Sequence, residues 1–137
     1  MARTIMRGSE LPNSFWSFAV HYSCYVLNRC ASSALKGITP QEAKTGKRPN
    51  VDDLHTFGCD AWVKIEKGQL FQGKRREKWD PVAQKAIFLG CCDVSPSYYC
   101  LILDTNKVVR SRNVRFALES FAHVKLLLRV LKIGFFT

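Results

Sequence analysis

The 137-residue chain lacks every paired-cysteine pattern that would indicate a metal site. It contains six cysteines, but none form a C-x-x-C pair, and no Cys or His cluster has the spacing of zinc ligands. It also lacks a secretory signal, because no apolar segment with a small-residue cleavage site follows the first arginines. We therefore expect reduced, mostly buried thiols, no cofactor, and a nuclear or cytoplasmic protein that is not secreted.

Long apolar runs are absent too: the longest uncharged stretch, residues 11–28, is interrupted by Pro12, Asn13 and several serines, so we expect no membrane-spanning helix. Acidic residues are scarce: 11 Asp and Glu stand against 21 Lys and Arg, giving a formal net charge of +10. The scattered acids offer no set of nucleophile, base or metal ligands, so the sequence argues against an enzyme. The basic excess favours a polyanionic partner, nucleic acid first and an acidic membrane surface second.

Helical signals occupy residues 1–55. The first residues resemble the last turns of a helix that ends at Gly8. Residues 14–30 predict a second helix with a wide apolar face, which should be buried against a partner; that face holds Phe15, Phe18, Ala19, Tyr22 and Val26.

A third, short helix is predicted by "TPQEAKTG". Thr39 can cap the amide of Glu42, Pro40 suits the first helical position, and Gly46 ends the helix. A polar loop follows, and we place a domain boundary there, near residue 55.

From Phe57 the apolar period changes to two. In the first expected strand, Cys59, Ala61, Val63 and Ile65 alternate with Asp60, Trp62, Lys64 and Glu66. "AQKAIFLG" and "SYYCLILD" predict two more strands, Asn106 suits positive φ in the turn "DTNK", and "VVRSRNVRF" predicts one or two strands beyond it. Short strands at this spacing favour a small curled sheet or SH3-like barrel over residues 56–116.

An ordered set of motifs runs through the chain from "LPNSFW" through "YVLNR", "TPQE", "GKRP" and "LHTFGC" to "KWDPVAQKAIFLG" and "KVVRSRNVRF". In this order the motifs resemble the end of the integrase region in copia-type retrotransposon Pol polyproteins, together with the SH3-like domain that follows it. The resemblance covers roughly residues 1–116.

The resemblance implies an α+β fold in three parts. Residues 1–55 would be the helical tail end of an RNase H-like integrase core, residues 56–116 an SH3-like β-barrel, and residues 117–137 a tail outside the family pattern. The family's Asp-Asp-Glu set, which holds two divalent metal ions, would lie upstream of Met1. We therefore expect a non-catalytic fragment, with an ancestral role in DNA integration.

Two basic clusters are candidate phosphate-binding sites. A loop beside Trp79 carries Lys74, Arg75, Arg76 and Lys78, and the last strands carry Arg110, Arg112 and Arg115. Arg110 and Arg112 should share a sheet face, since alternate residues do. Nucleic acid, DNA rather than RNA, is the expected partner through its phosphate backbone. The alternatives are a solvated loop, Trp79 closing the barrel core, and arginines that protect an edge strand.

Other partners stay open at this point. Residues 14–30 could contact the missing integrase core or a second copy of the chain. A domesticated or incidental module could bind protein through the barrel edge or the basic tail. In that tail, Lys125, Arg129 and Lys132 share one helical face, which suits either a membrane-surface helix or read-through sequence.

Overall fold

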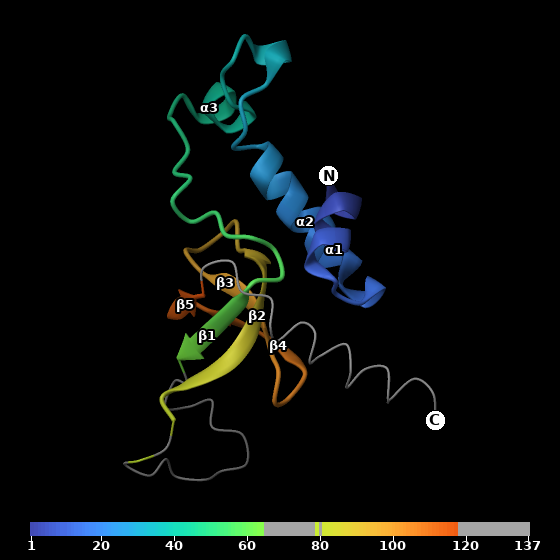
Figure 1. Ribbon diagram of the computed structural model, residues 1–137. Helices are drawn as coiled ribbons and strands as arrows, with labels where there is room; N and C mark the ends of the chain where they lie inside the picture. The colour runs from blue at the N-terminus through green and yellow to red at the C-terminus, as the bar shows by residue number, and fades with distance from the viewer. Residues whose placement is uncertain (65–78, 80, 118–137) are drawn as a thin grey trace.

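A computed structural model describes residues 1–64, 79 and 81–117 of the chain (Figure 1). Its helices are α1 (Ala2–Ser9), α2 (Trp16–Leu27) and α3 (Pro40–Thr45), with short 3-10 turns at Asn13–Phe15 and Ser33–Leu35. Its strands are β1 (Asp60–Lys64), β2 (Ala83–Cys91), β3 (Tyr98–Ile102), β4 (Lys107–Ser111) and β5 (Val114–Phe116). The expected α+β class, helices first and strands after, is confirmed.

The five strands form one antiparallel sheet in the order β4-β3-β2-β1-β5. The predicted closed barrel is wrong: within the described residues, β4 pairs with β3 and β5 pairs with β1, and the sheet stays open. Only two residues connect these edge strands, and there the Ser111 hydroxyl accepts a hydrogen bond from the Asn113 amide at 3.2 Å.

The alternation predicted for the first strand is confirmed over β1. Ala61 and Val63 are buried, and Trp62 and Lys64 are exposed. Asp60 departs from the pattern and is buried at the start of the strand. The turn between β3 and β4 has Asn106 at φ 51°, as its sequence predicts, while Ile65 and Glu66 lie outside the described residues.

Helix α2 lies against β2, so the sheet covers part of its apolar face (Figure 1). The Tyr22 ring meets the Phe88 ring edge-on at 5.3 Å between centroids, and it stacks against Phe57 at 6.0 Å. The opposite side of the helix leaves Trp16 63% and Leu27 51% exposed. One core cluster therefore joins the N-terminal helices to the sheet, and the domain boundary near residue 55 stays a prediction.

A second, smaller core cluster lies within the sheet itself. Its buried members are Val63, Ala86, Cys100 and Ile102. They come from β1, β2 and β3, so this cluster holds the curled sheet together independently of the helices.

The helix ends show where local signals suffice. Thr39 accepts a hydrogen bond from the Glu42 amide at 3.1 Å, and Gly46 ends α3 at φ 70°, both as predicted. The predicted stop of the first helix at Gly8 is wrong, because α1 continues to Ser9 and Glu10 takes the left-handed conformation. Ser9 is 1% exposed, so its packing in the interior fixes this end.

Candidate nucleic-acid interface

A groove of about 600 Å³ opens where β5 and the start of β2 flank β1. Its lining residues are Trp62, Lys64, Val82, Ala83, Arg112, Asn113, Val114 and Arg115. Among these described lining residues, three side chains are cationic and none is acidic. The groove is therefore a positively charged concavity with an aromatic side chain in its wall.

The strand register places a basic residue on the strand to each side of Trp62. Trp62 of β1 lies directly opposite Lys85 of β2 and Arg115 of β5. Directly opposed residues on one face have side chains close enough to interact. The Lys85 Nζ atom lies 5.4 Å from the Trp62 ring centroid, within cation–π range.

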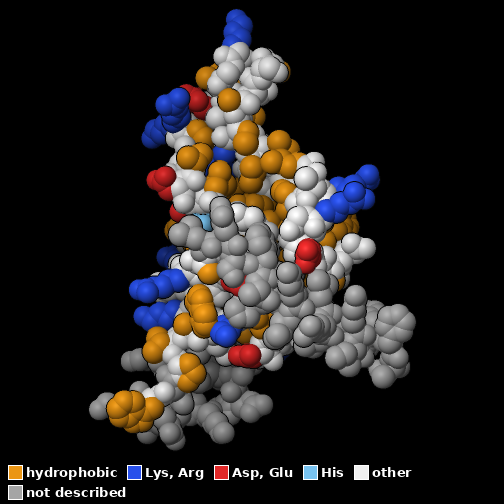
Figure 2. All heavy atoms as spheres, in the orientation of Figure 1, with side chains coloured by type: hydrophobic (Ala, Val, Ile, Leu, Met, Phe, Trp, Pro, Cys, Tyr) orange, Lys and Arg blue, Asp and Glu red, His pale blue; other side chains and the backbone are white. Residues whose placement is uncertain are grey.

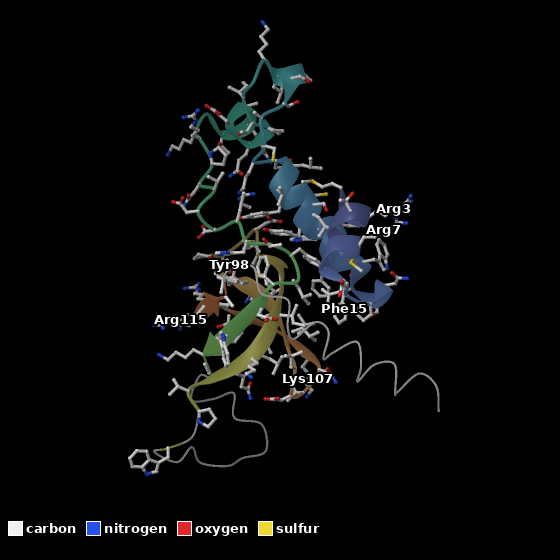
Figure 3. The ribbon with its side chains drawn as sticks, viewed as in Figure 1. Arg3, Arg7, Phe15, Tyr98, Lys107 and Arg115 are labelled. Atoms are coloured by element: carbon white, nitrogen blue, oxygen red, sulfur yellow. The ribbon has the colours of Figure 1, made fainter. Side chains whose placement is uncertain are left out.

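Other basic residues that the structure describes lie on separate parts of the surface. Figure 3 shows Arg115 at the β5 edge, whereas Arg3 and Arg7 project from α1 on the other side of the molecule. In Figure 2, Lys and Arg side chains gather beside the sheet at its β5 edge and also at separate places on the helices. The groove is thus one local concentration of positive charge on a broadly basic chain.

The structure places the predicted arginines Arg110, Arg112 and Arg115 on two different parts of the surface. Arg110 and Arg112 flank buried Ser111 and are both exposed, in agreement with the alternation. Arg112 lines the groove with Arg115. Arg110 instead lies on β4, the edge strand farthest from β5, where it pairs with Tyr99 of β3. A phosphate-binding role for Arg110 would therefore involve a different part of the surface.

The predicted basic loop, Lys74, Arg75, Arg76 and Lys78, lies outside the described residues. Trp79 beside it is 89% exposed, so the interpretation that this ring closes the core is wrong. The core is closed instead by the β-strand side chains around Phe88, which is fully buried.

Sequence reasoning did not select Trp62, Lys64 or Lys85 as site residues. A signal existed, because Trp62 and Lys64 fall on the polar side of the β1 alternation, where a large aromatic is unusual. Lys85 could not be added without the register that sets it opposite Trp62.

The six cysteines are all free thiols, and half of them are buried. Burial raises the pKa of Cys59 and Cys91 to about 11 and that of Cys100 to about 12. Cys92 differs: hydrogen bonds from the backbone at Val94 and Ser95, and then from the Tyr99 hydroxyl, lower its pKa to about 6. Three of the six thiols are buried, so the expectation of mostly buried thiols is met by only half of them. The lowered pKa of Cys92 favours its thiolate at neutral pH.

Other kinds of centre have little support in the described structure. Residues 1–64, 79 and 81–117 contain no group of three His, Cys, Asp or Glu side chains that could hold a metal ion. His55 stacks on Phe116 at 3.6 Å between ring centroids, and burial lowers its pKa, so its contacts are those of a packing residue. In the same part of the chain, no helix has both the length and the apolar character needed to cross a membrane.

Comparison with known proteins identifies the class of domain that this sheet builds. Residues 59–125 match the family model of the retroviral polymerase SH3-like domain. The chain is 35% identical over 114 residues to the Retrovirus-related Pol polyprotein from transposon TNT 1-94 of Nicotiana tabacum, covering 83% of this chain and 8% of that protein. It is 28% identical over 113 residues to the corresponding polyprotein from transposon RE1 of Arabidopsis thaliana, covering 82% of this chain and 7% of that protein.

These matches show homology to a region of retrotransposon Pol polyproteins that includes an SH3-like domain. The chain spans less than a tenth of the length of the curated relatives it matches. No solved structure gives a significant match.

Proposed function

We propose that this chain is a non-catalytic, nucleic-acid-binding part of a copia-type Pol polyprotein, located at the end of the integrase region, with an ancestral role in DNA integration. The observation that carries the proposal is the groove in which Lys64, Arg112 and Arg115 converge beside Trp62 without an acidic neighbour in the described lining. The homology to Pol polyproteins supports this setting.

Binding through these cations would use the phosphate backbone. Lysine and arginine side chains that neutralise phosphates release condensed counterions, which makes affinity fall steeply as salt rises. Such contacts position the protein without reading sequence, so we expect weak, nearly sequence-independent binding, with DNA as the partner. Lys74, Arg75, Arg76, Lys78 and Arg110 stay predicted as additional phosphate contacts.

The charge test is a variant with Lys64, Arg112 and Arg115 all replaced by Ala. Each lost contact to duplex DNA should reduce the slope of log affinity against log salt by about 0.9, so the variant should be flatter by roughly 2.7. Fluorescence anisotropy of a labelled duplex over a salt series measures the slope.

The matched control removes charge elsewhere. Arg3→Ala with Arg7→Ala lowers the net charge on α1, far from the groove, and should leave the slope nearly unchanged (Figure 3). Arg75→Ala with Arg76→Ala tests the predicted loop separately, with an expected loss of about 1.8. A groove variant that kept the parent slope would contradict the proposal for the groove.

Catalysis is proposed to be absent because strand transfer needs carboxylates that hold two divalent ions, and the scattered acids of this chain offer no such set. The pure chain, incubated with a labelled duplex end and Mg²⁺ or Mn²⁺, should therefore give no joined or cleaved product. Product formation that disappears on chelation would refute this.

The open sheet supports a second candidate function, protein binding at a sheet edge. Within the described residues, β4 and β5 each pair on one side only. Such edges can accept an added strand from another protein. This candidate would replace the first if the parent chain bound neither duplex nor single-stranded DNA at low salt.

A further inference from the structure

Lys85 continues the exposed face of the groove onto β2. It lies two residues from Ala83, which lines the groove, so the two side chains share one face of the strand. The register sets Lys85 opposite Trp62 and Ala83 opposite Lys64. Lys85 is exposed, although it does not belong to the groove lining. Its charge therefore lies beside the groove, on the other side of β1 from β5.

We infer that Lys85 is a further phosphate contact of this site and that Trp62 is its positioning residue, so that the nucleic-acid backbone lies across β5, β1 and β2. This inference rests on the proposed function and names a binding residue outside the lining of the groove.

The contact between Lys85 and Trp62 is the observation that assigns these roles. The Lys85 Nζ atom lies over the indole ring, 5.4 Å from its centroid. A lysine side chain has a flexible four-carbon stem, and immobilising it when a ligand binds costs conformational entropy. An aromatic ring that already holds the ammonium reduces this cost. Because an ammonium has three N–H donors, Lys85 can contact the ring and still donate to a phosphate oxygen.

The charge of this surface is not neutralised within the described part of the chain. Among residues 1–64, 79 and 81–117, neither Lys85 nor the three groove cations pair with a carboxylate, and the ion pair found there joins His21 and Asp93. Neighbouring strands lie about 4.8 Å apart, so the backbones of β2 and β5 are separated by roughly 10 Å across β1. Long cationic side chains on both sides of β1 can therefore contact several phosphates of one nucleic acid.

Lys85→Met tests the phosphate contact. Methionine keeps an unbranched side chain that can pack on Trp62, but it carries no charge. In the full chain, the slope of log affinity against log salt for a labelled duplex should become flatter by about 0.9. Lys85→Arg keeps the charge and should retain the parent slope. As a matched control, Lys44→Met removes an exposed lysine from α3, which lies away from the sheet in Figure 1, and should leave the slope nearly unchanged.

Trp62→Leu tests the positioning role. Loss of the ring releases the lysine side chain, so duplex affinity at one salt concentration should fall by about 2- to 5-fold. The slope should stay close to the parent value, because all the cations remain. In the Lys85→Met background the same change should have little further effect, since Trp62 acts through Lys85. A ring that only supported the sheet would weaken binding equally in both backgrounds.

Thermal unfolding of each variant shows whether the sheet is retained. If Trp62→Leu does not fold, Trp62→Phe takes its place in the comparison. Its expected loss of affinity is smaller, because phenylalanine attracts cations less strongly than tryptophan.

The outcomes distinguish this inference from the function beneath it. A parent slope in Lys85→Met, with a flatter slope in the groove variant, would overturn the assignment of Lys85 and leave the groove's function in place. Equal effects of Trp62→Leu with and without the Lys85 charge would overturn the positioning role. A parent chain that bound neither duplex nor single-stranded DNA at low salt would instead overturn the proposed function.

Discussion

Replacing Gly58 with Ala is expected to destabilise the folded chain by about 2–5 kcal/mol. Gly58 has φ +81°, a conformation that costs an L-residue roughly 1–2 kcal/mol. An added Cβ would also lie 2.5 Å from the Ser9 Cβ and 3.3 Å from the Ser9 Cα. Because Ser9 is buried at the end of α1, its backbone cannot move aside without disturbing the core.

Two other glycines serve as matched controls, measured by urea denaturation. Gly37 has φ +89°, and a methyl group added there would meet nothing within 4 Å, so Gly37→Ala should show the conformational cost alone. Gly8 lies inside α1 with open space around it, and Gly8→Ala should stabilise the helix by about 0.5–1 kcal/mol. If Gly58→Ala cost no more than Gly37→Ala, the close packing of α1 against the start of β1 would be disproved.

Sequence reasoning succeeded where one short segment holds all the determinants. The cap of α3 needs only Thr39, Glu42 and Gly46, which are close in the chain, and the prediction was confirmed. The exposure pattern of β1 follows from alternation alone, and the Asn106 turn from the tolerance of that residue for positive φ.

The failures share a physical cause, which is that tertiary contacts decided the outcome. The end of α1 is set by burial of Ser9 and not by the helix-breaking tendency of Gly8. Whether the sheet closes depends on which strands pair across the chain, and the order β4-β3-β2-β1-β5 is not set by the periodicity of any one strand. For the candidate site, charge alone selects Arg112 and Arg115. The neighbouring positions of Lys85, Trp62 and Arg115 follow only from the pairing of β1 with β2 and β5.

The apolar face of α2 illustrates a different limit. Its helical spacing predicts that it is buried, but spacing does not say against which partner. In this chain part of that face lies on β2, through Ala19 and Tyr22, which are almost fully buried. The outer side, with Trp16 and Leu27, stays exposed, and a contact there with an integrase core or a second copy stays a prediction.

Replacing Tyr22 with Ala is expected to have the largest effect of any single change at this helix–sheet contact, about 3–5 kcal/mol. The ring packs against Phe88, Phe57 and Tyr25. Its hydroxyl donates to the His55 carbonyl and accepts from the His55 amide, the latter at 3.1 Å. The substitution removes the ring from the core and leaves both backbone groups without this partner.

Graded variants separate the two losses. Tyr22→Phe keeps the ring and removes only the hydroxyl, so it should cost about 1–3 kcal/mol. Trp16→Ala changes a ring that is 63% exposed on the same helix and should cost less than about 1 kcal/mol.

Urea denaturation gives the free energies of unfolding, and binding of a hydrophobic dye reports release of α2 from the sheet. Tyr22→Ala should raise dye binding well above the parent and Trp16→Ala should not, since Tyr22 belongs to the core cluster that joins helix and sheet whereas Trp16 is mostly exposed. Equal dye binding by the parent, Tyr22→Ala and Trp16→Ala would mean that α2 does not depend on the sheet for its burial.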